Sequence, residues 1–152
     1  MGVRENIQAG YQLIWNTAKR NVELMPDAGM EFTPAGLETR SFRAIAIHMA
    51  NASAWFGDSV GKANWERTQT YPDKPTSKAD VLEAMGEAGD RFITGTSRLT
   101  DEEAGRMVGV PWGGQMPQGA ALMGGVSHMF YHNGQLSIYL RMKGIKPFFV
   151  AR

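Results

Sequence analysis

The 152-residue sequence contains no cysteine. This absence excludes disulfides, cysteine-ligated zinc, iron–sulfur clusters and a nucleophilic thiol supplied by the chain itself. Any thiol chemistry at this protein therefore needs a thiol from a second molecule. The chain also has no acidic residue after Glu103, so a carboxylate base near its C-terminal segment would have to come from elsewhere in the fold or from another chain.

The sequence has neither an excess of one charge nor a long apolar run. Sixteen basic and fifteen acidic side chains leave a formal charge of +1, which gives no reason to expect a nucleic-acid partner. No stretch has the length of a membrane-spanning helix, and the first residues lack an apolar signal segment. Asn6 stands where a myristoylation signal at Gly2 needs Ser or Thr. We expect a cytoplasmic protein without membrane or nucleic-acid partners.

Four segments have apolar residues three or four positions apart, the spacing of amphipathic helices. The first ends at Pro26, the second runs from about Ser41 to about Val60, the third begins near Ser77, and the fourth extends from near Pro117 to about Met142, before Gly144. The positions that carry the spacing in the first three are Ile7, Tyr11, Ile14, Ala18, Val22, Met25, Phe42, Ile45, Met49, Ala52, Phe56, Val81, Met85, Ala88 and Phe92. Because strand signals are nearly absent, the pattern predicts an all-α fold: one four-helix bundle domain over residues 1–152.

Local signals refine these boundaries. Ser77 and Asp80 have the spacing of a capping box, with Asp in place of the usual Glu. Thr100 and the three acidic residues that follow it could open a short additional helix. The Gly-rich segment 108–114 predicts a loop with a brief extended piece.

The three histidines are the strongest candidates for chemistry. His128 and His132 stand four residues apart in the fourth helix, so both imidazoles share one helix face. His48 lies in the middle of the second helix, and two helices of a bundle can direct such side chains into one core site. Three neutral imidazoles are a sufficient ligand set for zinc and leave a fourth position open, although nickel, iron or manganese also fit. The pattern predicts one divalent metal ion per chain; the alternative is a set of core histidines with satisfied hydrogen bonds.

The residues between the paired histidines exclude one mechanism. Zinc proteases of the HExxH type place a glutamate directly after the first histidine as general base, whereas Met129 occupies that position here. Lewis-acid chemistry of the metal remains: it can ionise a bound water or a bound thiol. The thiol route needs no carboxylate base.

Three residues near the pair in the fourth helix could take part in catalysis or substrate binding. Gln135 shares the face of His128 and His132 and could orient a ligand or a bound water. Tyr131 and Tyr139 flank that face, and either hydroxyl could donate to a substrate oxygen. A core role is the alternative for each of the three.

Further candidates for a substrate pocket come from other segments. Asn51 and Trp55 lie three and seven residues after His48, and Trp112 lies in the Gly-rich loop before the fourth helix. Both indoles could line a pocket, although an aromatic residue at helical spacing is more often part of the core. Gly124 and Gly125, one turn before His128, could leave room above the metal or allow a neighbouring helix to approach closely.

The sequence resembles the DinB-like superfamily of metal-binding four-helix bundles. The resemblance rests on the segment from His128 through His132-Asn-Gly-Gln135 to the Leu-Arg helix end at Arg141 and Gly144, and on the segment 43–51 around His48. It extends over almost the whole chain. It implies an up-down-down-up bundle, often a homodimer, with the metal at one end of a cleft. Many relatives carry Arg after the second histidine of the pair, where this chain has Asn133; a substrate contact could therefore differ.

Members similar to this chain include transferases that use bacillithiol or mycothiol. The leading hypothesis is therefore a metal-dependent enzyme in which His48, His128 and His132 hold the ion and a low-molecular-weight thiol, bound as thiolate, attacks a small-molecule electrophile. Its two rivals are a hydrolase that uses metal-bound hydroxide and a non-catalytic bundle that binds metal or serves a stress-related role.

Overall fold

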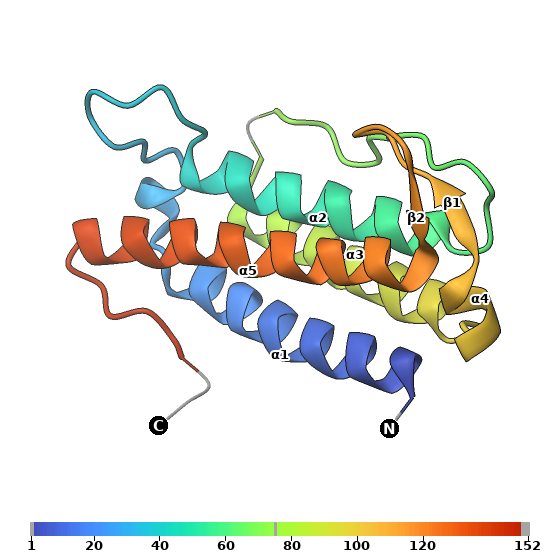
Figure 1. Cartoon of the computed structure of the whole chain (residues 1–152). Coiled ribbons are helices and arrows are strands. Elements are labelled where there is room, and N and C mark those ends of the chain that lie inside the picture. Colours follow the sequence, from blue (N-terminus) through green and yellow to red (C-terminus); the bar gives the residue numbers. More distant parts are fainter. Residues whose placement is uncertain (1, 75, 150–152) are drawn as a thin grey trace.

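The computed structural model describes residues 2–74 and 76–149, which form a helical bundle with one small hairpin (Figure 1). The elements in chain order are α1 (Val3–Leu24), a short 3-10 helix (Asp27–Gly29), α2 (Phe42–Ser59), α3 (Lys78–Thr96), α4 (Asp101–Gly105), β1 (Met107–Gly109), β2 (Gln115–Pro117) and α5 (Gln118–Met142). The four long helices predicted from the apolar spacing are therefore confirmed.

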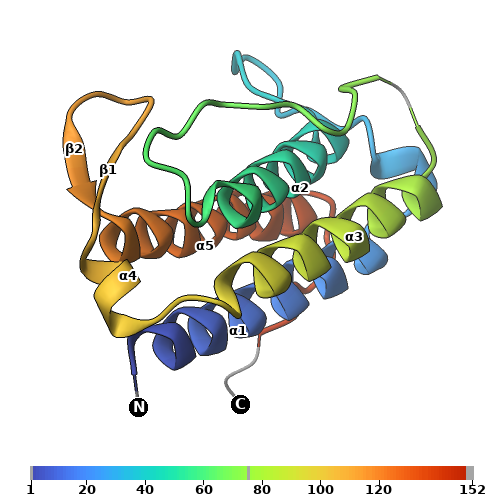
Figure 2. The ribbon, with the colours of Figure 1, turned by 90° about the vertical axis from the view of Figure 1, so that its right-hand side faces the viewer.

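The long helices have the up-down-down-up arrangement that the family resemblance implied. Figures 1 and 2 show that α1 and α5 run in one direction and that α2 and α3 run in the other. In this arrangement α2 packs on α3 and α5, and α1 packs on α5 and α3. Because α2 and α3 are parallel, the connection at 60–77 has to travel back along the length of the bundle, and it does so beside the hairpin (Figure 2).

Side-chain caps fix three of the helix starts. The Ser41 hydroxyl accepts a hydrogen bond from the Ala44 amide at the start of α2. Ser77 opens α3 with a reciprocal capping box to Asp80, as the spacing predicted. Thr100 opens α4 with a second capping box, and this confirms the short additional helix. Each cap satisfies amide groups that have no partner within the helix.

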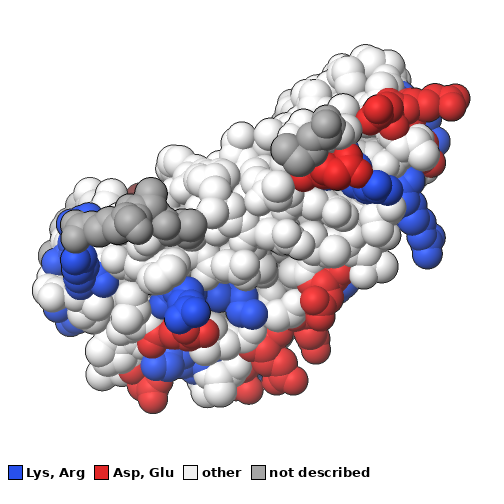
Figure 3. All heavy atoms as spheres, turned by 90° about the horizontal axis from the view of Figure 1, so that it is seen from below, with Lys and Arg blue, Asp and Glu red and all other residues white. Residues whose placement is uncertain are grey.

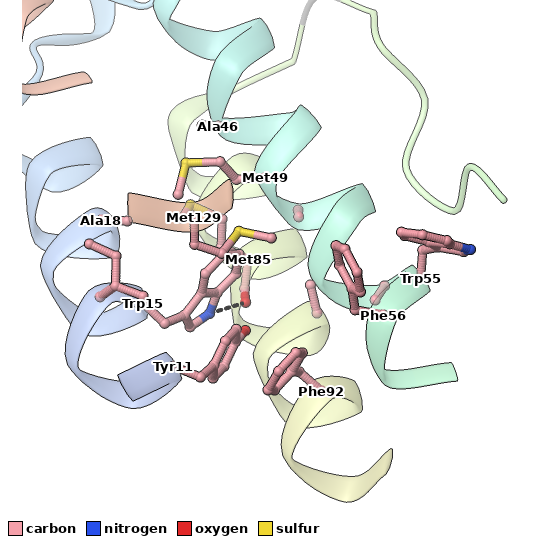
Figure 4. Close-up of a cluster of buried hydrophobic side chains, with 14 of the residues drawn as sticks. Tyr11, Trp15, Ala18, Ala46, Met49, Trp55, Phe56, Met85, Phe92 and Met129 are labelled. Carbon is pink, nitrogen blue, oxygen red and sulfur yellow. Dashed lines mark hydrogen bonds between the residues drawn. The ribbon is translucent and has the colours of Figure 1, made fainter. Parts of the chain in front are cut away.

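Aromatic and methionine side chains fill the core between the helices (Figure 4). The Tyr11 ring of α1 stacks on Phe92 of α3, with ring centroids 3.8 Å apart. The Trp15 indole donates to the Met85 carbonyl at 3.0 Å, and the Tyr11 hydroxyl lies 2.5 Å from that of Ser53. These buried polar groups therefore have partners, and this avoids the cost of desolvating them unpaired.

Two glycines permit the closest contact between helices. A Cβ atom on Gly57 of α2 would lie 2.5 Å from the carbonyl oxygen of Arg91, and one on Gly95 of α3 would overlap the carbonyl oxygen of Gly57. Any side chain at either position would push α2 and α3 apart. The glycines that cost helix propensity in the sequence are thus used for packing at this point.

The segment predicted as a loop with an extended piece is a two-stranded antiparallel hairpin, in which Val108 faces Met116. The hairpin also holds the connection between α2 and α3. Trp65 donates its amide to the Gly109 carbonyl at 2.9 Å, and the Gly109 amide donates to Ala63 at 2.8 Å. The α2–α3 connection is thereby fixed at the end of the bundle where α5 begins.

Charges of both signs share the molecular surface. On the face shown in Figure 3, basic and acidic side chains are interspersed around a broad uncharged area, as the near-neutral sum leads one to expect. Among the described residues, no helix combines the length and the apolar character needed to cross a bilayer.

Candidate metal centre

The three histidines meet between α2 and α5. One ring nitrogen from each lies within 4.8 Å of the others, and the Nε2 atoms of His48 and His128 are 3.0 Å apart. The rings of His128 and His132 have centroids 4.3 Å apart, because a spacing of four residues places both on one face of α5. The structure therefore brings together the three residues that the sequence singled out.

The spacing of these nitrogens fits a single divalent ion. Two nitrogens bound to a tetrahedral zinc, each at about 2.0–2.1 Å, lie about 3.3 Å from one another. The 3.0 Å between His48 and His128 is close to this value, and the candidate ligand nitrogens of all three histidines lie within 4.8 Å of one another. Three imidazoles without a cysteine or carboxylate suit zinc and also nickel or iron.

The environment keeps the three imidazoles in the neutral form that binds metal. Burial lowers the pKa of His48 and of His128 to about 4, and the positive charges of His132 and Arg40 add to the effect. Burial also lowers the pKa of His132. At neutral pH the site therefore offers three unprotonated rings, so that an ion does not have to displace protons in order to bind.

Gln135 orients one of the three histidines. Its side-chain oxygen lies 2.6 Å from Nδ1 of His132, one helical turn earlier on α5. Because an amide oxygen only accepts, this contact requires a proton on Nδ1 and leaves Nε2 of His132 free for an ion. The contact places Gln135 behind a ligand, and its predicted catalytic role remains a prediction.

A cavity of about 830 Å³ opens beside the histidines. His48 and His128 lie on its wall, whereas His132 is buried and is not part of the lining. An ion held by the three rings would therefore face the cavity on the side of His48 and His128. The other lining residues are Arg40, Ala44, Ile47, Asn51, Ala52, Trp55, Phe56, Arg67, Thr68, Gln69, Asp73, Trp112, Met116, Ala120, Ala121 and Gly124.

The apolar end of the cavity is built from aromatic side chains. Trp55 is a buried member of the core cluster on α2 and packs next to Phe56, with ring centroids 4.4 Å apart (Figure 4). Trp112, from the turn of the hairpin, packs edge-on against Trp55 with ring centroids 6.1 Å apart. Trp55 and Trp112 therefore lie where the sequence analysis placed them, although their contact with a substrate is still a prediction.

Asn51 also lines the cavity, but its amide is already occupied. The side-chain oxygen accepts from the amides of Thr70 and Tyr71, both at 2.8 Å, and the NH₂ group donates to the Tyr71 carbonyl at 2.8 Å. The Trp55 indole donates at 2.6 Å to the carbonyl of Glu66, which lies four residues before Thr70 in the connection. Asn51 and Trp55 thus fasten the α2–α3 connection on both sides of residues 67–69, which form a wall of the cavity.

The two tyrosines predicted near the site lie outside the cavity lining. The Tyr139 hydroxyl donates to the Arg40 carbonyl at 2.9 Å and lies 3.1 Å from the Thr39 hydroxyl. It therefore holds the backbone that carries Arg40. Tyr131 is 65% exposed, with its ring centroid 5.1 Å from that of His132. Its predicted role as a donor to substrate is not tested by this position.

The two glycines before His128 have different surroundings. A Cβ on Gly124 would meet no atom within 4 Å, and this residue lines the cavity. A Cβ on Gly125 would lie 2.9 Å from the Phe56 ring, so this glycine allows α2 and α5 to approach. Asn133, where many relatives carry arginine, points away from the cavity and accepts from Asn21 of α1 at 2.9 Å.

Three charged residues of the cavity were missed by sequence reasoning. Arg40 lies in the connection before α2, and Arg67 and Asp73 lie in the connection after it. All three belong to irregular segments, where no periodic spacing indicates which side chains face the site. The buried Arg43 joins the two connections by pairing with Glu31 and, at 3.1 Å, with Asp73.

Comparison with known proteins agrees with this description. The model of the DinB family matches residues 12–151. A DinB-like protein of Bacillus subtilis superposes with a TM-score of 0.79 at 17% identity, covering 95% of this chain and 96% of that one. No curated protein matches the sequence.

Two further solved structures share the fold. A second Bacillus subtilis protein, described as a probable metal-dependent hydrolase with an unusual four-helix bundle topology, gives a TM-score of 0.72 at 19% identity over 94% of this chain and 89% of its own. A mycothiol-dependent maleylpyruvate isomerase gives 0.69 at 12% identity, over 90% of this chain and 63% of the isomerase. At these identities the likeness establishes the fold alone.

Proposed function

Because the chain belongs to the DinB family, we propose that it is a metal-dependent enzyme that transfers a low-molecular-weight thiol to a small electrophile. The observation that carries the proposal is the three-histidine group on the wall of a large cavity. Within the described ranges, the only candidate metal group consists of three imidazoles and includes no carboxylate.

The histidines fit the chemistry of an ion with an open coordination position. A divalent ion at such a site ionises a bound thiol or water at neutral pH. The thiol route suits this chain because it needs no carboxylate base and because the chain has no cysteine of its own. In the transfer, the thiolate sulfur forms a bond to an electrophilic carbon and a leaving group departs with its bonding electrons; an activated double bond takes up a proton instead.

The residues of the chain have separate tasks in this proposal. His48, His128 and His132 hold the ion, and Gln135 fixes the orientation of His132 at 2.6 Å. Trp55 enters the apolar part of the cavity and excludes water from the reacting molecules. Loss of water around a thiolate strengthens the electrostatic interactions that stabilise its reaction.

Hydrolysis is the second candidate, and Asp73 favours it. Asp73 is the carboxylate among the cavity-lining residues, and it could accept a proton from an attacking water. Its oxygen is 3.1 Å from the Arg43 guanidinium, however, so the carboxylate already takes part in an ion pair. A related structure is described as a probable metal-dependent hydrolase, whereas another is a mycothiol-dependent isomerase, so the relatives support both chemistries.

The first experiment measures metal content by mass spectrometry on untagged protein. We expect about one equivalent of zinc, nickel or iron per chain in the wild type and its loss in the variant with His128→Ala and His132→Ala. Ser127→Ala is the matched control, since Ser127 is an exposed neighbour on the same helix. A wild type that remains empty after addition of zinc and nickel would make the histidines core residues and contradict the proposal.

The second experiment separates the candidate reactions. The metal-loaded protein is offered glutathione, bacillithiol or mycothiol together with an aryl halide, an epoxide or an activated alkene. Thiol transfer predicts conjugates that require both metal and thiol, whereas hydrolysis predicts turnover of an ester without thiol. A protein that binds metal but gives neither product would be the non-catalytic bundle. The expected homodimer and cytoplasmic location remain predictions, and light scattering measures the first.

A further inference from the structure

Two arginines border the cavity next to the histidines. Arg40 and Arg67 both line it, one from the connection before α2 and one from the connection after it. Both arginines therefore share one cavity with His48 and His128, where they can act on a molecule bound beside these rings.

Each arginine stands on backbone that is held in place by a helix. The Tyr139 hydroxyl of α5 donates to the carbonyl of Arg40 itself at 2.9 Å. Arg67 directly follows Glu66, whose carbonyl accepts from the Trp55 indole at 2.6 Å. Asn51 fixes the chain again at Thr70, three residues after Arg67. Two irregular segments are thus fastened so that their cations face one space.

In the described part of the chain, neither arginine is paired with an acidic side chain. Among residues 2–74 and 76–149, Arg40 and Arg67 take part in no ion pair and no side-chain hydrogen bond. Asp73, the carboxylate of the same cavity, is paired with the buried Arg43 instead. The cavity therefore carries two cations whose guanidinium donors remain available, the arrangement that suits a carboxylate ligand.

The rest of the cavity favours an apolar body. Trp55 and Trp112 contact each other edge-on at one end, with Phe56 and Met116 beside them. Gly124 contributes no side chain and leaves room in front of His128. Indole rings provide large, rigid surfaces for aromatic or aliphatic groups.

We propose that this cavity selects an organic anion, with its carboxylate between Arg40 and Arg67 and its apolar body against Trp55 and Trp112. The inference deepens the proposed function and rests on it only for the conclusion that the bound molecule reacts at the metal. The carboxylate could belong to the electrophile or to the low-molecular-weight thiol, since both would lie beside the histidines. In either case the arginines determine which molecules are accepted.

Calorimetric titration with a matched pair of ligands tests the binding without any reaction. Naphthylacetate and naphthylacetamide share the aromatic body and differ in charge. We expect the metal-free protein to bind the carboxylate about tenfold more tightly than the amide, and more weakly at high salt. The double variant Arg40→Gln, Arg67→Gln should lose this preference. Arg98→Gln, an exposed arginine outside the cavity, is the control and should retain it.

Zinc-loaded protein and a thiol pair identify the source of the anion. If the double variant loses discrimination between glutathione and its ethyl ester, the arginines hold the thiol; if it loses discrimination between the naphthyl ligands, they hold the electrophile. Either loss supports the proposal. Equal binding of acid and neutral analogue in both pairs, or a preference that the double variant keeps but metal removal abolishes, would overturn it.

The outcomes also separate this inference from the proposed function. Selective anion binding without conjugation by any thiol would reject the transferase and leave the anion site standing. Metal-dependent conjugation with unchanged selectivity in the arginine variants would support the transferase and reject the anion site. Thermal unfolding followed by circular dichroism checks that each variant remains folded.

Discussion

Replacing Gln135 with alanine should weaken zinc binding, even though Gln135 would not contact the ion itself. Its side chain acts through the hydrogen bond to His132. The amide oxygen accepts the Nδ1 proton of His132 at 2.6 Å and so keeps Nε2 directed toward His48 and His128. His132 is 4% exposed, so water reaches the vacated position poorly. In the variant, either the buried Nδ1–H group of His132 has no hydrogen-bond partner, or the His132 ring reorients when it binds the ion.

The size of the effect follows from the role of such contacts. Loss of a hydrogen bond behind a metal-bound histidine typically lowers metal affinity by about 10- to 100-fold. This corresponds to about 1.4–2.8 kcal/mol, in the range for an unsatisfied buried polar group. The short contact and the low exposure of His132 place the expectation in the upper half of the range.

Competition with a chromogenic chelator at neutral pH measures the zinc affinity. Gln115→Ala is the control, because Gln115 is an exposed glutamine on β2, outside the cavity lining. Gln135→Glu should bind zinc at least as tightly as the wild type, since a carboxylate accepts the same proton more strongly. Unchanged affinity in Gln135→Ala would refute the reasoning, whatever the behaviour of the glutamate variant.

Three further predictions concern stability. The free energy of unfolding of the metal-free protein should fall as the pH drops from about 6.5 toward about 4, because His48 and His128 titrate near 4 when folded and near 6.5 when unfolded, so that the unfolded chain takes up more protons. Denaturant titrations across this window measure the fall, and replacing both histidines with glutamine should reduce it. Gly95→Ala should destabilise by about 2 kcal/mol through overlap with α2, whereas Gly134→Ala, with open space around it, should stabilise by about 0.5–1 kcal/mol. Tyr11→Phe should cost about 1–2 kcal/mol by removing a buried hydroxyl contact, measured by chemical denaturation.

The helices and the histidine group were predictable because both depend on spacing along one chain segment. Apolar positions three or four residues apart indicate a buried helix face whatever that face contacts. The interval of four between His128 and His132 fixes their proximity in any helix. The proximity of His48 to this pair depends on how two helices pack, and it could be predicted because the bundle fold was predicted first.

The charged part of the cavity could not be predicted in the same way. Arg40 and Arg67 lie in irregular connections, where the direction of a side chain depends on tertiary contacts and not on a period. The hydrogen bonds of Asn51 to residues 70 and 71 illustrate the difficulty. The position of Asn51 on the helix predicted that it faces the pocket, but nothing local indicated that its amide holds a connection.

The helices carry the histidines of the site, whereas the irregular connections carry the two arginines of the cavity. The three histidines lie on α2 and α5, whose relative position is set by close packing such as that of Gly125 on Phe56. Arg40 and Arg67 lie in the connections before and after α2. Hydrogen bonds and ion pairs of Arg43, Tyr139 and Asn51 hold these connections against the helices. Irregular segments tolerate substitution better than packed helices do. Substitutions in the connections can therefore change the charge of the cavity while the packed helices keep the three imidazoles in place.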